Sequence, residues 1–145
     1  MTNTDTVNHW LASLNPDLRL NEAGYCSLSN GDVALVAEVP ETTGCCHLFG
    51  VVMPPPEGVN LALWLQEALR LNLMGRPLLG AWLAFDPDEN ALFLCQNLRI
   101  ASSTAEDFAA VTGTLAEIIP SVRDHLTPSL ETLAEMREEA ALAEE

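Results

Sequence analysis

The tripeptide Cys45-Cys46-His47 places two thiols beside an imidazole, which could serve a nucleophile or a metal site. A catalytic thiol needs its base within hydrogen-bonding reach, and zinc needs ligands that converge on one point. The surrounding residues, however, predict a strand over Cys45–Met53, in which successive side chains point to opposite faces. Cys46 then faces away from its two neighbours. We therefore expect no catalytic residue, no metal site and no cofactor.

Other candidate chemistry in the chain is weaker still. His9 and His125 fall on separate elements, and the four cysteines include no CxxC pair, so reduced structural thiols are expected. The acidic run 86–90 superficially resembles a calcium loop, but it lacks the twelve-residue spacing and the closing glutamate. A solvated turn is expected there. A binding protein is favoured, and a small enzyme is kept as an alternative.

The charge of the chain excludes several classes of partner. Its 145 residues include 21 acidic residues and six arginines but no lysine, which gives a net charge of −15. Such a chain is repelled by phosphate backbones and by anionic membrane surfaces, so no nucleic acid and no membrane are expected as partners. A basic protein partner is compatible with the charge, and so is the simpler reading that acidity keeps an apolar protein soluble.

The apolar residues point to a globular cytosolic protein. The chain is 48% hydrophobic, enough for a core, and its most apolar stretch, Asn60–Phe85, is broken by Gly75, Pro77 and Gly80. The N-terminal residues MTNTDTVNHW lack a basic region followed by an apolar one, so no secretory signal is predicted. We expect a cytoplasmic location.

Hydrophobic periodicity and turn residues predict the order α-β-β-β-α-β-β-α. The expected elements are a helix over Thr4–Leu14, strands over Gly24–Leu28, Val33–Val39 and Cys45–Met53, a helix over Val59–Met74, strands over Leu79–Phe85 and Ala91–Leu98, and a helix opened by a capping box at Ser103 and Glu106. This order indicates an α+β fold with a twisted antiparallel sheet over residues 1–127. Residues 128–145 are expected to form an acidic C-terminal helical extension, with Thr127 as N-cap and Pro128 at its first position.

Both faces of the predicted sheet are apolar. Phe49 and Val51 oppose Leu48 and Val52 on the third strand, and the second and fifth strands repeat this pattern. In a sheet with one face exposed to water, apolar and polar residues alternate along each strand. This sheet lacks that alternation, so it should be covered on both sides. The first and last helices can cover one face, and the middle helix is the remaining candidate for the other.

The middle helix is itself apolar around most of its circumference, more than one small domain can bury. A two-fold homodimer is the economical explanation, although a monomer with a central helix is the alternative. The expected dimer interface consists of Leu61, Trp64, Leu65, Ala68, Leu69, Asn72 and Trp82. Apolar surface that remains after dimerisation would mark a binding site for a partner. For that surface we expect Trp10, Leu14, Val33, Leu35, Phe49 and Val51.

Three stretches together resemble the class I type III secretion chaperones, the Tir chaperone or CesT-like family. "LQEALRLNLMGRPLLGAWLAFDPDENALFLCQNL" is similar to the leucine-rich helix of that family, which ends in Asn (here Asn72) and is followed by a glycine and two strands. "LNEAGYCSLSNGDVALVAEV" resembles its first hairpin, and "DFAAVTGTLAEIIPSVRDHL" its last helix. The resemblance covers about Thr4 to Leu126.

The resemblance implies a homodimeric, non-enzymatic chaperone of the bacterial cytoplasm. Its partners would be the N-terminal chaperone-binding segments of one or more secreted effectors, held in extended form, and the ATPase of the secretion system is a second candidate partner. An extended segment can add a strand to a sheet edge while its apolar side chains enter grooves. The alternative is a regulatory protein of the same fold that sequesters a folded cytosolic partner. The run Pro54–Pro56 and the acidic extension have no place in the family pattern.

Overall fold

The computed structural model describes residues 1–73, 77–128 and 130–143. Its elements are α1 (Asn3–Leu14), β1 (Tyr25–Asn30), β2 (Val33–Glu38), β3 (Cys45–Met53), α2 (Leu61–Arg70), β4 (Trp82–Asp86), β5 (Ala91–Arg99), a short 3-10 turn (Ile100–Ser102), α3 (Ala105–Leu126) and α4 (Leu130–Ala143). The predicted α+β fold and the predicted order of helices and strands are therefore confirmed.

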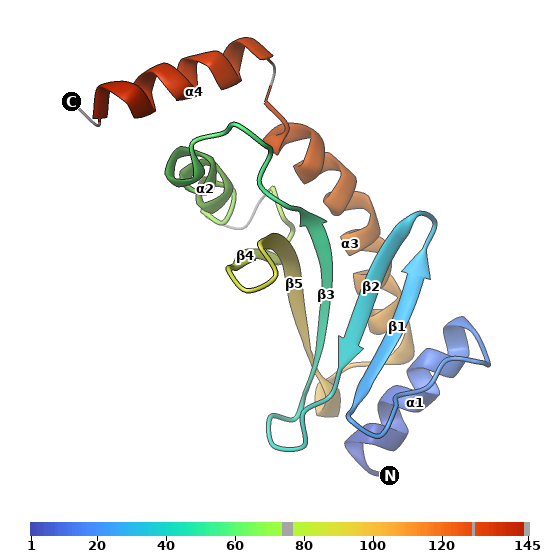
Figure 1. Cartoon of the computed structure of the whole chain (residues 1–145). Coiled ribbons are helices and arrows are strands. Elements are labelled where there is room, and N and C mark those ends of the chain that lie inside the picture. Colours follow the sequence, from blue (N-terminus) through green and yellow to red (C-terminus); the bar gives the residue numbers. More distant parts are fainter. Residues whose placement is uncertain (74–76, 129, 144–145) are drawn as a thin grey trace.

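The five strands form one antiparallel sheet in the order β1-β2-β3-β5-β4 (Figure 1). Two hairpins build it, as predicted. The β1–β2 hairpin turns on Gly31 and Asp32, with Gly31 at a φ of 62°, which favours glycine. The β4–β5 hairpin turns on the polar residues that follow Asp86.

α3 crosses one face of this sheet and packs against β1, β2, β3 and β5. α1 lies alongside α3, where the rings of Trp10 and Phe108 are 5.7 Å apart. α3 packs closely on the sheet at Gly50, which is buried on β3. A methyl group at Gly50 would lie 2.8 Å from both Ile119 Cδ1 and Leu35 Cδ2 and 2.9 Å from the carbonyl oxygen of Ala34. Only glycine therefore allows α3 to approach the sheet this closely.

The other face of the sheet lacks the helix that we expected. α2 lies beside the C-terminal part of α3, beyond the end of β3, rather than over the sheet (Figure 1). The expectation that α2 covers the second face is thus wrong, because α2 packs beside α3, where its buried Trp64 bonds to Leu126. Burial on β2 and β3 alternates accordingly: side chains toward α3 are buried, and those on the opposite face are half-buried or exposed. We call the opposite side the open face.

α2 is also shorter than its predicted span, Val59–Met74. It begins at Leu61 because the side chain of Asn60 accepts a hydrogen bond from the N–H of Leu63 at 3.1 Å. After Arg70 the next three residues continue as a turn closed by i to i+3 hydrogen bonds. The predicted end at Met74 and the predicted C′ residue, Gly75, lie outside the described residues.

The strand after α2 begins at Trp82 rather than at Leu79. Leu79 and Gly80 have φ angles of 51° and 91°, and the N–H of Ala81 bonds to Leu78 O at 3.0 Å, so these residues form a turn. The first strand similarly runs over Tyr25–Asn30, two residues past its predicted end. Apolar runs do not reveal where positive φ angles interrupt a strand.

The two predicted helix starts near the C-terminus need correction. α3 is opened by a capping box between Thr104 and Asp107, not between Ser103 and Glu106, with side-chain bonds of 3.1 and 2.9 Å. Either pair satisfies the same sequence pattern. α4 begins at Leu130, so Thr127 ends α3 and is not the N-cap of α4.

The packing at Gly50 predicts that two glycine-to-alanine substitutions change the free energy of unfolding in opposite directions. Gly50→Ala should lower the free energy of unfolding by ~1–3 kcal/mol, because the added methyl group must displace Ile119, Leu35 or backbone. Gly113→Ala, on α3 with nothing within 4 Å of the new methyl group, should raise it by about 0.5–1 kcal/mol. Urea unfolding followed by circular dichroism measures both. Equal effects of the two substitutions would contradict the close packing of α3 on β3.

Candidate protein-binding surfaces

The open face carries a continuous apolar row across four strands. In register, Val36 lies opposite Phe49, Phe49 opposite Cys95, and Cys95 opposite Trp82. Side chains directly opposite one another on one face of a sheet lie in contact distance. The row therefore runs from β2 through β3 and β5 to β4, the strand at one edge of the sheet.

A second row strengthens the apolar character of this face. Val51 lies opposite Phe93, and Phe93 opposite Ala84. The rings of Phe49 and Phe93 meet edge to face with centroids 6.2 Å apart, so they pack against each other. Val51 is 47% exposed and Trp82 39% exposed. These large apolar side chains are exposed to water, and no described part of the chain covers them.

The far end of the open face is polar. Glu38 lies opposite His47, and His47 opposite Asn97, where His47 Nδ1 and Asn97 Oδ1 form a hydrogen bond. The open face is therefore apolar from its centre to β4 and polar beside the loop that precedes β3.

The thiol–imidazole motif does not assemble, as predicted. Cys46 is fully buried on the face toward α3, whereas His47 lies on the open face. Burial raises the pKa of the Cys46 thiol to about 12, so it is protonated and a poor nucleophile at neutral pH. Burial also raises the pKa values of Cys26 and Cys95. Within the described residues, no three potential metal ligands lie close enough together to hold an ion.

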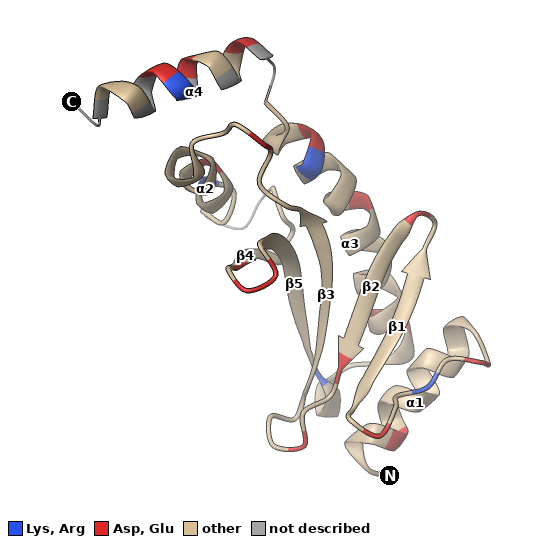
Figure 2. Cartoon of the chain, viewed as in Figure 1, with Lys and Arg blue, Asp and Glu red and all other residues tan. Residues whose placement is uncertain are grey.

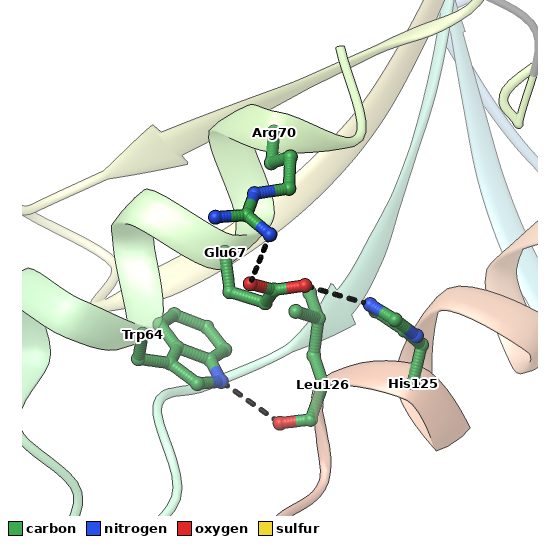
Figure 3. A network of polar contacts seen from close by, with 5 residues as sticks. All are labelled: Trp64, Glu67, Arg70, His125 and Leu126. Atoms are coloured by element: carbon green, nitrogen blue, oxygen red, sulfur yellow. Dashed lines mark hydrogen bonds and ion pairs between the residues drawn. The ribbon is translucent and has the colours of Figure 1, made fainter. Parts of the chain in front are cut away.

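α2 is fixed by polar contacts with the end of α3 (Figure 3). The indole Nε1 of Trp64 donates to Leu126 O at 2.9 Å, a buried hydrogen bond between residues 62 positions apart. Glu67 lies 3.1 Å from His125 Nε2 and 3.9 Å from Arg70, both at exposed positions that contribute little to stability. The Trp64 contact therefore sets which side of α2 faces inward.

Asn72 ties the turn after α2 to β4. Its Nδ2 donates to Leu83 O at 3.1 Å, and its Oδ1 accepts from the N–H of Leu83 at 2.8 Å. The side chain of Asn72 thereby satisfies the main-chain N–H and C=O of Leu83 at the edge of β4, where β4 has no neighbouring strand. The side of α2 that faces away from α3 is left with exposed leucines, among them Leu61 and, at 62% exposure, Leu69. Leu73, just after the helix, is exposed as well.

The residues expected at a dimer interface differ in their exposure. Trp64 and Ala68 are each only 1% exposed and belong to the core of the chain. Leu61, Leu69 and Trp82 are exposed, Leu65 is half-buried, and Asn72 has the internal role described above.

The residues expected to bind a partner also divide. Trp10, Val33 and Leu35 are buried on the side of α1 and α3. Phe49 and Val51 lie on the open face. Leu14 is exposed and lines a separate hollow of ≈ 470 Å³ between the end of α1 and β1.

The structure adds to the open face residues that the expected sites omitted. Phe93, Cys95 and Ala84 join Phe49 and Trp82, and several of them border a hollow of ≈ 220 Å³. Trp82 and Phe49, assigned from the sequence to two different surfaces, lie in the same row. The alternation of apolar residues in the fifth strand already marked Phe93 and Cys95 as sharing one face. Only the pairing of β5 with both β3 and β4 shows that this face adjoins Phe49 and Trp82.

The family model of the Tir chaperone protein (CesT) family matches residues 6–117. The chain belongs to this family. The resemblance noted in the sequence is thereby confirmed, and the family is one of chaperones, in agreement with a binding rather than an enzymatic role. A comparison with curated protein sequences finds no match.

Solved structures share the fold. The ExsC–ExsE complex contains a chain with a TM-score of 0.75 at 20% identity, matching 87% of this chain and 97% of that one. The ExoU–SpcU complex from the type III secretion system of Pseudomonas aeruginosa gives 0.65 at 23% identity, with 85% and 99% matched. The HopA1–SchA chaperone–effector complex gives 0.64 at 17% identity, with 83% and 91% matched. Among the helices described, none is long and apolar enough to cross a bilayer.

The double hydrogen bond of Asn72 predicts a local effect on β4. Asn72→Ala should destabilise the chain by about 1–3 kcal/mol, because the partly buried N–H of Leu83 loses its acceptor. Amide hydrogen exchange at Leu83 should accelerate more than at the centre of β3. Gln66→Ala, at an exposed position of α2, is the matched control and should leave exchange at Leu83 unchanged. Unchanged exchange at Leu83 in Asn72→Ala would show that the contact does not hold β4.

Proposed function

We propose that this protein is a type III secretion chaperone that binds the N-terminal chaperone-binding segment of one or more secreted effectors. It holds the segment in extended form and so keeps the effector stable and competent for secretion. The observation that carries the proposal is the open face, an apolar sheet surface that none of the described helices covers. The family of the chain and the partner-bound state of its structural relatives support it.

The chemistry of the open face suits an unfolded client better than a folded one. Its exposed side chains are spaced by strand geometry, so an extended segment can match them with alternate apolar residues. The net charge of −15 keeps so apolar a surface soluble and attracts a client segment with basic residues. The buried thiols offer no chemistry toward the client.

We propose further that the chaperone acts as a homodimer in the bacterial cytoplasm. The outer side of α2, with Leu61 and Leu69, supplies a self-complementary apolar patch for a two-fold interface. Trp82 lies on the open face, so client and dimer surfaces meet near β4. The acidic α4 stays outside the chaperone domain in this proposal, and the secretion ATPase is a further partner for the client-loaded dimer.

The dimer is tested by placing a charge at its expected centre. Leu69→Glu should weaken association by about 100-fold, since an unpaired buried charge costs ~3 kcal/mol. Light scattering over a concentration series measures this. Leu142→Glu, at a 69% exposed position on α4, is a control of similar exposure and should leave the dimer intact. A monomeric wild-type protein, or equal association of Leu69→Glu and wild type, would overturn the assignment.

The client is tested by capture from the native host, followed by mass spectrometry and hydrogen exchange of the complex. We expect a secreted protein whose N-terminal segment is protected only when bound and has no core of its own. Val51→Glu should reduce capture at least tenfold, because it places a charge at the exposed centre of the open face. Leu142→Glu is again the control. A captured partner that is fully folded in the complex would favour a regulator that sequesters folded protein.

A further inference from the structure

A small hollow lies on the covered side of the sheet, between α3 and the turn that precedes β4. Its volume is ≈ 100 Å³. Gln96 of β5 lines it from the sheet, and Gln96 lies opposite the fully buried Leu48, hence on the face toward α3. Buried Ala81 and Leu115, with half-buried Val111, form its apolar wall. We call it the Gln96 hollow, and it is separate from the open face.

The Gln96 hollow contains hydrogen-bonding groups that the chain leaves unused. The side-chain oxygen Oε1 of Gln96 is buried, and none of the described residues donates a hydrogen bond to it. A buried acceptor without a donor is destabilising and uncommon in folded proteins. Thr114 of α3 also lines the hollow, and its hydroxyl forms no hydrogen bond with a described residue, whereas that of Thr112 donates to Ala109 O at 2.9 Å. The hollow therefore offers two oxygens to a donor from outside.

The rim of the hollow has an unusual backbone conformation. Leu79 and Gly80 have φ angles of 51° and 91°, in a turn closed by the bond from the N–H of Ala81 to Leu78 O. A positive φ is costly for a residue other than glycine, and such residues are enriched at functional sites. The turn holds the side chain of Leu79 67% exposed beside the hollow, although Leu78 is fully buried. An exposed leucine in a strained turn, next to an unpaired acceptor, indicates contact with another molecule.

The size and polarity of the hollow limit what enters it. A cavity that holds benzene has a volume of about 150 Å³. The Gln96 hollow, at ≈ 100 Å³, admits the end of one side chain rather than a large ring. Its apolar wall suits methylene groups, and its two oxygens require a donor at the tip. Lysine has a thin alkyl stem that ends in a compact ammonium group with three N–H donors, whereas the planar guanidinium of arginine is broader.

The charge around the hollow also favours a cation. Glu106 lies four residues before Ala110, and Glu117 lies three residues after Thr114, so both exposed carboxylates share the side of α3 that lines the hollow. Neither forms an ion pair with a described residue. Acidic segments recur along α3, whereas its basic residues lie in its last turn (Figure 2). A cationic side chain is therefore attracted to this side of the helix, most strongly at low salt.

We propose that the Gln96 hollow binds a lysine side chain on the surface of a protein other than the client. The ammonium group donates to Gln96 Oε1 and to the hydroxyl oxygen of Thr114, and the methylene groups lie between Leu79 and Val111. This chain contains six arginines and no lysine, so a second copy supplies no such side chain. A client on the open face lies on the other side of the sheet, so both partners can be bound at once. The inference thus goes beyond the proposed function.

The test uses the isotope-labelled full-length protein and Nα-acetyl-lysine methylamide, followed by nuclear magnetic resonance. Titration should shift the side-chain amide signals of Gln96 and the backbone signal of Leu79, and these shifts should saturate at millimolar concentration. The corresponding norleucine and arginine compounds should bind at least tenfold more weakly, because norleucine lacks the ammonium group and arginine is broader. Equal binding of the norleucine compound would overturn the inference, since recognition would then be apolar only. Equal binding of the arginine compound would also overturn it, because a second copy supplies arginine.

Two variants test the oxygens of the hollow. Gln96→Met keeps the length of the side chain and removes Oε1, so it should weaken binding of the lysine compound at least fivefold. It should not lower the urea midpoint, because the oxygen removed has no donor in the described chain. Thr114→Val removes the hydroxyl at similar volume and should weaken binding at least twofold. Gln66→Met, at an exposed position of α2, is the matched control and should leave binding unchanged. Binding unchanged in Gln96→Met, or a lowered midpoint, would overturn the inference.

Capture of the client separates this inference from the proposed function. Gln96→Met should capture the client at the wild-type level, and Val51→Glu on the open face should bind the lysine compound as tightly as the wild type does. Loss of client capture by Gln96→Met would assign the hollow to the client and overturn the second partner. Failure of the lysine compound to bind, with client capture intact, would remove the hollow as a site and leave the chaperone proposal standing.

Discussion

The packing of α3 on β3 at Gly50 is the contact on which the rest of the molecule depends. Because a methyl group there would collide with Ile119, Leu35 and the backbone at Ala34, glycine brings the longest helix directly onto the sheet. α3 then reaches four of the five strands, and α1 packs beside it. One face of the sheet is thereby closed, and within the described residues no further helix lies over the other.

The position of α2 follows from the same arrangement. Its indole Trp64 bonds to the last turn of α3, and Asn72 bonds to β4, so the helix is held at the end of the sheet and not on its face. This placement leaves two apolar surfaces, the outer side of α2 and the open face. The two bonds from Asn72 to Leu83 bring the end of α2 beside β4, the strand that carries Trp82 of the open face.

Strand pairing and net charge both affect what the open face can bind. Pairing of β3 with β5 runs along the strand apart from a bulge between Val51 and Met53, whereas pairing of β3 with β2 covers only three residue pairs. A chain with 21 acidic residues repels acidic segments over the whole of its surface.

The sequence by itself determined the element order, the α+β class, both hairpins, the two-faced apolar pattern of the strands and the family resemblance. Each of these depends on local periodicity and turn chemistry, which neighbouring residues specify. The tertiary structure decided which apolar residues are core and which are surface. Trp10, Leu35, Trp64 and Ala68 are buried, whereas Phe49, Val51, Trp82 and Leu69 remain accessible. An apolar strand or helix has the same pattern whether its second face meets its own chain or a partner, so only the packing of α2 and α3 distinguishes the two.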